Sequence, residues 1–163
     1  FEGTATRAGV NMTTLYRRWG TKEALMLDAI RQRVSAKVPI PDTGSLREDL
    51  LTLVRSAIAN VSTVEVNAMI RVGITLSPHE SVVANVVETF WTDRLAVDAV
   101  IVERAIARGE IAPVDPEFVI EAVLGPPYFR LFVTRRPVTD DFLVATVDLV
   151  VNGLVPHQGT LTS

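Results

Sequence analysis

The residue types that carry most enzyme chemistry are scarce in this sequence. It has no cysteine and two histidines, His79 and His157, and it contains no G-x-S-x-G, no H-E-x-x-H and no glycine-rich phosphate-binding loop. The adjacent acids Asp140 and Asp141 stand where a helix is expected to begin, and carboxylates are favourable there because of the helix dipole. No group of acids recurs at metal-ligand spacing beside a histidine. We therefore predict no catalytic residue, no metal and no cofactor.

A glycine turn near the start separates two short predicted helices, over residues 2–8 and 12–19. The glycine in Ala8-Gly9-Val10 can take the positive φ that a tight turn requires, and Asn11 is a good N-cap for the second helix. Two short helices joined in this way predict a helix-turn-helix, a common DNA-binding unit. The alternative is a helical hairpin that carries surface arginines.

The second short helix carries polar groups suited to DNA on its outer faces. Leu15 and Trp19 are four residues apart, so both face inward and leave hydroxyl and guanidinium groups outside. The next helix begins after Thr21, an N-cap residue, which puts Lys22 beside free amides that bind phosphate. The predicted DNA contacts are Met12, Thr13, Thr14, Tyr16, Arg17, Arg18 and Lys22.

Charge is divided unevenly along the chain, although the net charge is only −3. Residues 1–37 carry seven basic and three acidic side chains, whereas residues 38–163 carry nine basic and sixteen acidic ones. A basic head on an acidic body indicates that the head meets a polyanion such as DNA. Chance clustering would give the same division.

Two prolines and a glycine within residues 39–44 end one helix and mark a linker between two predicted domains. Residues 1–38 are predicted to form the helix-turn-helix domain with its connecting helix, and we expect the first helix of this domain to precede Phe1. Residues 45–155 form the second domain, and residues 156–163 form a tail. No segment shows the sustained alternation of a strand, so the predicted fold is all-α.

The second domain is predicted to be a series of capped helices. Ser45-Leu46-Arg47-Glu48 matches a capping box, in which the serine hydroxyl accepts from the Glu48 amide and the glutamate reaches back. The helix it opens runs to about Val61, with an apolar stripe at helical spacing. A shorter helix covers about 64–76.

The remaining helices have equally clear boundary signals. A long helix from Ser77-Pro78 is expected to end at Gly109, a left-handed C-cap, and its length predicts a kink near Thr92. Another helix starts at Asp115-Pro116, is disturbed at residues 125–127 and resumes to 133. Thr139 caps the last helix, and Gly153 ends it.

The stretch from Ala5 to Leu25, ATRAGVNMTTLYRRWGTKEAL, resembles the tetracycline-repressor (TetR/AcrR) family of bacterial regulators. The shared features are the A-G-V turn, the T-L-Y-R core, an aromatic residue at Trp19 and a lysine at Lys22. Thr4 departs from the family, which usually has Ile or Val there. The resemblance implies a recognition helix over residues 13–18, a phosphate contact at Lys22, and a helical domain that binds ligand and dimerises.

The last predicted helix is apolar around most of its circumference, since only Thr146 and Asp148 are polar within residues 142–151. Such a helix is buried on all sides, either between its own core and a second copy or wholly within its own chain. The preceding helix would complete a four-helix bundle between two copies, as the resemblance also implies. The predicted interface residues are Tyr128, Phe132, Phe142, Leu143, Val147 and Val150.

An effector pocket is expected among the middle helices, where the family encloses its ligands. Such pockets combine apolar walls with a few polar anchors. Large apolar residues at helical spacing are also ordinary core residues, so both interpretations stay open. The predicted ligand-binding residues are Met69, Phe90, Trp91 and Arg94.

These features together predict a ligand-responsive transcriptional repressor, not an enzyme, that binds a palindromic operator as a homodimer. Its predicted partners are double-stranded operator DNA, a second copy and an unknown small-molecule effector. No run reaches the roughly 18–20 apolar residues of a membrane span, so we predict a cytoplasmic location and no membrane partner. The alternatives are a helical dimeric adaptor or an all-α enzyme that does not bind DNA.

Overall fold

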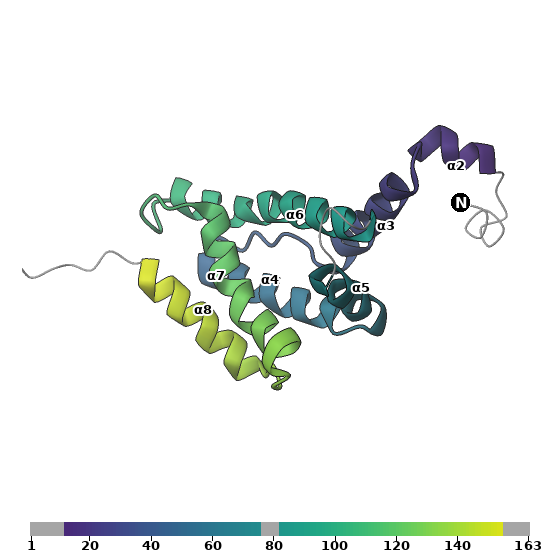
Figure 1. Cartoon of the computed structure of the whole chain (residues 1–163). Coiled ribbons are helices and arrows are strands. Elements are labelled where there is room, and N and C mark those ends of the chain that lie inside the picture. Colours follow the sequence, from purple (N-terminus) through teal and green to yellow (C-terminus); the bar gives the residue numbers. More distant parts are fainter. Residues whose placement is uncertain (1–11, 76–81, 155–163) are drawn as a thin grey trace, which may run out of the picture.

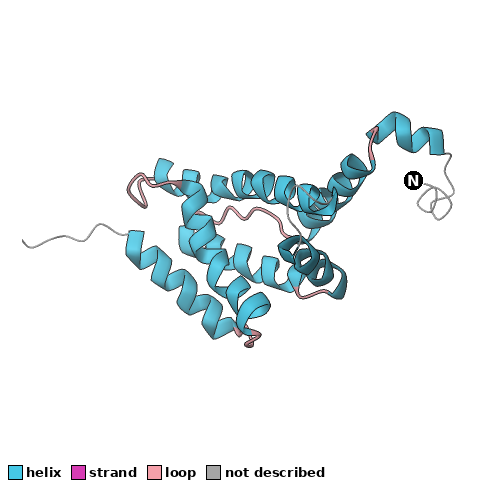
Figure 2. Ribbon diagram, viewed as in Figure 1, coloured by secondary structure: helices cyan, strands magenta, loops and turns pink. Residues whose placement is uncertain are grey.

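The computed structural model describes residues 12–75 and 82–154, and every regular element within these ranges is a helix (Figures 1 and 2). The prediction of an all-α fold is confirmed. The turn at 8–10, Asn11, Ser77-Pro78 and both histidines lie outside the described residues. In chain order the elements are α2 (Met12–Trp19), α3 (Lys22–Lys37), α4 (Leu46–Val61), α5 (Val64–Thr75), α6 (Val82–Ala107), α7 (Pro116–Tyr128), the π-helix η1 (Phe129–Thr134) and α8 (Asp140–Leu154).

Helices α4 to α8 form a body from which α3 and α2 project at one corner (Figure 1). Within this body α6 packs against α7 and α5, and α4 packs against α8, α7 and α5. α6 also packs against α3. α2 packs against α3, which continues into the body beside α6. The segment predicted to bind DNA is therefore joined to the body through α3. Within the described ranges, no helix has both the length and the apolar character that crossing a membrane requires.

α4 is the central helix of the core, and its predicted apolar stripe is buried. Leu50, Leu53 and Val54 have no exposed surface, and full burial of each such side chain contributes about 1.5–3 kcal/mol to folding. The stripe consists of Leu46, Leu50, Leu53, Val54, Ala57, Ile58 and Val61.

Ser45 caps α4 as predicted, but the capping box is only half formed. Its hydroxyl accepts from the Glu48 amide at 3.5 Å. The Glu48 carboxylate does not reach back and instead accepts from Arg47 at 2.8 Å, while the Ser45 amide donates to Thr43 Oγ1 at 3.3 Å. A bond between two charged groups is stronger than one to a neutral amide, so the carboxylate pairs with the neighbouring guanidinium.

The disturbance expected at residues 125–127 lies further along the chain. α7 continues through both prolines to Tyr128, and the helix widens to the π form only from Phe129 to Thr134. Pro126 and Pro127 lack the amide that would bond one turn earlier, so the hydrogen-bond register changes immediately after them. The segment ends at Arg135, whose φ of 55° is left-handed.

Three other predicted boundary features have mixed outcomes. Gly109 is left-handed, with φ 72°, and the next amide bonds back to the Ala105 carbonyl at 3.0 Å, as a C-cap requires. α6 is continuous through Thr92, from Val82 to Ala107, and the kink expected there stays a prediction. Gly153 does not end the last helix, because α8 continues to Leu154.

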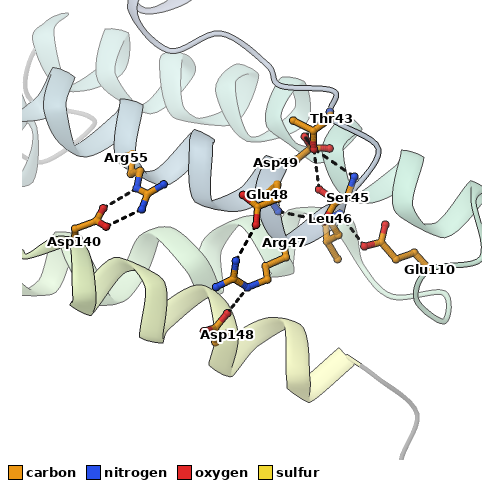
Figure 3. A network of polar contacts seen from close by, with 10 residues as sticks. All are labelled: Thr43, Ser45, Leu46, Arg47, Glu48, Asp49, Arg55, Glu110, Asp140 and Asp148. Carbon is orange, nitrogen blue, oxygen red and sulfur yellow. Dashed lines mark hydrogen bonds and ion pairs between the residues drawn. The ribbon is translucent and has the colours of Figure 1, made fainter.

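Two arginine–aspartate pairs fasten α8 to α4 (Figure 3). Arg47 Nε donates to Asp148 Oδ1 at 2.6 Å, and Arg55 holds both carboxylate oxygens of Asp140 at 2.6 and 2.7 Å. Hydrogen bonds from the Arg55 guanidinium lower the pKa of Asp140. Because both pairs are solvent-exposed, they set the position of α8 more than they add stability.

The lowered pKa of Asp140 predicts how this attachment responds to acid. The Arg55–Asp140 pair contributes fully to the free energy of unfolding at a pH above the ordinary aspartate pKa of about 3.9. This contribution is lost as the pH falls through the lowered pKa of Asp140. We expect Asp140→Asn to lower the melting temperature at neutral pH and to match the unsubstituted protein in strong acid. Thermal melts over pH measure this, with Asp141→Asn as control; an Asp140→Asn deficit that persists unchanged in acid contradicts it.

Candidate functional site

A cavity of about 120 Å³ lies between α3, α4, α5, α6 and α7. Most of the side chains around it are apolar and buried. An engineered apolar cavity of roughly 150 Å³ admits a benzene ring, so this one suits a single small ring. The residues that line it are Ile30, Arg33, Val34, Val38, Ala57, Asn60, Val61, Val66, Ile70, Phe90, Trp91, Arg94, Asp98, Leu124 and Tyr128.

Aromatic side chains from α6, α7 and η1 form a continuous row at one wall. Trp91 meets Phe90 edge-to-face at a centroid distance of 5.3 Å and meets Tyr128 at 5.6 Å. Tyr128 in turn meets Phe132 at 6.0 Å. Edge-to-face pairs of this kind add about 0.5–1.5 kcal/mol beyond the area they bury, so the wall is preformed.

The polar part of the cavity is built around one buried ion pair on α6. Arg94 Nε and Nη2 donate to the two carboxylate oxygens of Asp98 at 2.9 and 2.7 Å, and Nη2 also donates to the Val38 carbonyl at 3.0 Å. Arg94 is 9% exposed and Asp98 is 2% exposed. Burial raises the pKa of Asp98, and the Arg94 guanidinium opposes that shift. Because Val38 ends α3, the pair joins the cavity wall to that helix.

The structure brings three of the four predicted ligand-binding residues together. Phe90, Trp91 and Arg94 all line the cavity, whereas Met69 lies in α5 with a side chain outside the described set. Sequence reasoning did not select Asn60 or Asp98. The available signal for Asp98 was an arginine and an aspartate four residues apart, which lie on one face of a helix and can pair there.

The predicted DNA contacts lie on α2 and at the start of α3. Thr13, Thr14, Arg17 and Arg18 are exposed, and the Arg18 guanidinium lies 4.7 Å from the centroid of the Trp19 ring. The side chains of the other three predicted contacts, Met12, Tyr16 and Lys22, lie outside the described set.

A tight junction fixes α2 on α3. Trp19 Nε1 donates to Asp28 at 2.9 Å, and Gly20 takes a φ of 68°. Thr21 caps α3, as predicted, by accepting from the Ala24 amide at 3.1 Å. A movement of α3 therefore carries α2 with it.

The predicted dimer residues divide into two groups, and two of them, Leu143 and Val147, need correction. Leu143 and Val147 are 5% and 0% exposed within one chain, so their own core covers them and leaves no surface for a second copy. Tyr128 lines the cavity. Even a helix that is apolar all round turns one face toward its own core, and Leu143 and Val147 lie on that face of α8.

The remaining predicted residues lie at the edge of an exposed apolar surface. Phe132, Phe142 and Val150 are partly buried. Large apolar side chains on α7, η1 and α8 that sequence reasoning did not select are more exposed: Phe118 61%, Phe129 56%, Val133 63% and Leu149 77%.

Comparison with known proteins decides the family. Residues 40–150 match the family described as "Tetracyclin repressor-like, C-terminal domain". A solved TetR family transcription regulator superposes with a TM-score of 0.79 at 30% identity, over 95% of this chain and 86% of that one. The chain belongs to the TetR family. The match begins at Ile40, two residues after Val38, the C-cap of α3, so it covers the helical body.

Relatives described as HTH-type transcriptional regulators extend the likeness over nearly the whole chain. The HTH-type transcriptional regulator AqdR of Rhodococcus erythropolis is 39% identical over 68% of this chain, which corresponds to about half (53%) of its own length. The uncharacterized HTH-type regulator YdeS of Bacillus subtilis is 29% identical over 96% of this chain and 78% of its own length. An uncharacterized HTH-type regulator of Mycobacterium tuberculosis is 31% identical over 92% of this chain.

The buried pair gives a stability prediction. Arg94→Ala leaves the Asp98 carboxylate buried without a partner and is expected to lower the free energy of unfolding by about 3–5 kcal/mol. Arg94→Met combined with Asp98→Ala removes both charges and is expected to be clearly more stable than the single variant. Urea unfolding of all three proteins measures this, and a single variant as stable as the double variant contradicts it.

Proposed function

We propose that this chain is a ligand-responsive transcriptional repressor that binds a palindromic operator as a homodimer and is switched by a small molecule in the cavity. The observation that carries the proposal is the position of α3. Its N-terminal end carries α2, with exposed hydroxyl and guanidinium groups, and its C-terminal end is bonded to the cavity wall through Val38 and Arg94. We place this function in the cytoplasm, with no membrane partner.

Contacts along α3 support its role as a lever. Sixteen residues make it about 24 Å long. Arg31 pairs with Asp93 on α6, and Arg33 donates to Thr63 between α4 and α5 at 3.3 Å. Two reading heads in a dimer must fit major grooves about 34–36 Å apart. A small tilt of α3 at the cavity therefore changes this spacing without any contact between ligand and DNA.

The linker after α3 supports the same mechanism, because it is tied to the body. Arg104 donates to the Pro41 carbonyl at 3.2 Å, and the Thr43 amide and hydroxyl both donate to Asp49 Oδ1 at 2.7 Å (Figure 3). A fixed linker gives the C-terminal end of α3 a fixed position in the absence of ligand.

The exposed apolar residues on α7, η1 and α8 support dimerisation through these elements. Phe118, Phe129, Val133 and Leu149 are each more than half exposed. A second copy that packs the same surfaces against these residues would remove them from water. The family fold favours this regulator over an adaptor or an enzyme, neither of which needs the residue pattern of α2.

Arg17 and Lys22 are expected to contribute differently to DNA binding. Lys22→Ala removes a phosphate contact. It should therefore weaken binding to all DNA sequences alike and reduce the slope of log affinity against log salt concentration by about one. Arg17→Ala removes a base contact and should change preference at one base pair by about 1–3 kcal/mol. Fluorescence anisotropy of the full-length protein on DNA selected from a random pool, and on a scrambled duplex, measures both. Lys37→Ala, at the far end of α3, is the control, and equal effects of Arg17→Ala and Lys22→Ala on both duplexes contradict the assignment.

The dimer proposal makes a separate prediction. Leu149→Glu puts a carboxylate into the proposed interface, where burying it unpaired is highly unfavourable, and should convert the dimer to monomer. Val97→Glu is the matched control, because Val97 is also an exposed apolar residue (48%) but lies on α6. Light scattering should give twice the chain mass for the unsubstituted and control proteins. A monomeric unsubstituted protein, or a Leu149→Glu dimer, is the contrary result.

A further inference from the structure

We infer that the effector is an uncharged aromatic carbonyl compound of about one ring, whose oxygen accepts a hydrogen bond from Arg94 Nη1 inside the cavity. The inference rests on the proposed function, since it gives the chemical class of the effector for that same site. It follows from three features of the cavity: the polar lining groups that have no described partner, the balance of its buried charges, and its aromatic and apolar walls.

Three hydrogen-bonding groups line the cavity and have no acceptor or donor among the described residues. Arg94 uses Nε and Nη2 for Asp98 and Val38, but Nη1 donates to no described residue. The side-chain amide of Asn60, a residue 7% exposed, and the hydroxyl of Tyr128 are also without a described partner. A ligand oxygen can accept a hydrogen bond from Arg94 Nη1 here, and a bond from a charged donor is the stronger kind.

The donors remain donors at any pH at which the protein is folded. Arginine has no acceptor atom and keeps its charge. Burial raises the pKa of Tyr128, so its hydroxyl keeps its proton. The ligand group that matches Arg94 Nη1 is therefore an acceptor, and a carbonyl oxygen can accept a second bond from the Tyr128 hydroxyl or the Asn60 amide.

The charges in the buried part of the cavity already balance, which disfavours an ionic ligand there. Arg94 and Asp98 already neutralise each other, and both are buried. Arg33 lies at the edge, exposed to solvent and bonded to Thr63. An ammonium group would add a positive charge beside Arg94, and a carboxylate next to the buried pair would meet the Asp98 carboxylate. Either charge among the buried apolar side chains is far more unfavourable than a neutral polar group.

The walls define the rest of the ligand. Phe90, Trp91 and Tyr128 offer ring edges and faces at fixed mutual angles, which favour a planar aromatic partner over an aliphatic chain. Val34, Val61 and Leu124 close the cavity with apolar surface. The volume of about 120 Å³ limits the ligand to about one ring.

Four probes of nearly identical shape separate these requirements: acetophenone, α-methylstyrene, benzoate and benzamidinium. α-Methylstyrene replaces the carbonyl oxygen by a methylene group, and the two ions add a negative or a positive charge. The chain has two tryptophans, so a full-length Trp19→Phe protein leaves Trp91 as the fluorescent reporter within this chain.

Acetophenone is expected to give saturable quenching of Trp91 fluorescence. α-Methylstyrene should bind about tenfold more weakly, since a hydrogen bond to a charged group is worth about 1.4 kcal/mol or more. Benzoate and benzamidinium at neutral pH should not saturate where acetophenone does. Benzoate or benzamidinium that binds as tightly as acetophenone, or α-methylstyrene that binds equally well, overturns the inference.

Paired variants test whether Arg94 supplies the bond. In Arg94→Met/Asp98→Ala the preference for acetophenone over α-methylstyrene should disappear. It should persist in Arg55→Met/Asp140→Ala, which removes a bidentate arginine–aspartate pair on the outer side of α4 and α8. A preference retained in the first variant overturns the role of Arg94. The probe series on the Trp19→Phe protein decides the ligand class even where the first variant fails to fold.

DNA binding by the unsubstituted full-length protein, which keeps Trp19, is measured separately and keeps this inference distinct from the proposed function. If the four probes bind in the expected order but the protein binds no operator, the proposed regulator function is wrong and the proposed ligand class still holds. If the protein binds operator but the probes bind in a different order, only the proposed ligand class is wrong.

Discussion

A guanidinium is stable inside a protein only where an anion and hydrogen-bond acceptors surround it. Arg94 meets this requirement with groups from two separate parts of the chain, the Asp98 carboxylate on its own helix and the Val38 carbonyl at the end of α3. The same side chain forms part of the cavity wall. The solvation of one buried charge therefore fixes how α3 meets the body, and any ligand that bonds to Arg94 acts on that junction directly.

The rest of the body holds this junction in a fixed frame. The apolar stripe of α4 forms the centre of the core, and α8 is set against it by the pairs Arg47–Asp148 and Arg55–Asp140. The linker is bonded to Asp49 and Arg104. Trp19 and Thr21 fix α2 on α3, so in the proposed mechanism a tilt of α3 would carry α2 with it. This division suits a protein in which one part senses and another binds DNA.

Local signals in the sequence predicted the helices well, because caps and apolar periods act over a few residues. The Ser45, Thr21 and Gly109 boundaries followed from side-chain and backbone preferences alone. Predictions failed where a distant or competing partner decided the outcome. Glu48 paired with Arg47 instead of closing the capping box, and the effect of Pro126 and Pro127 appeared just after them, as a π-helix from Phe129.

The candidate site was less predictable for the same reason. Phe90, Trp91 and Arg94 could be selected as large side chains on a middle helix, but their common cavity depends on α3, α4 and α7. Leu143 and Val147 were selected because α8 is apolar all round, and only the packing of α4 and α7 shows which face points inward. The partner of Arg94 on α3 is a backbone carbonyl, which no residue type reveals.

Amide hydrogen exchange in the last turn of α3 tests the central claim most directly. The Val38 amide donates to the Val34 carbonyl at 2.7 Å, and its protection reports whether the end of α3 is held to the body. We predict that Arg94→Met/Asp98→Ala accelerates exchange at Val38 and its neighbours, while Arg55→Met/Asp140→Ala leaves it unchanged. Equal protection of Val38 in both double variants would show that the buried pair does not hold α3, and the account would then be wrong.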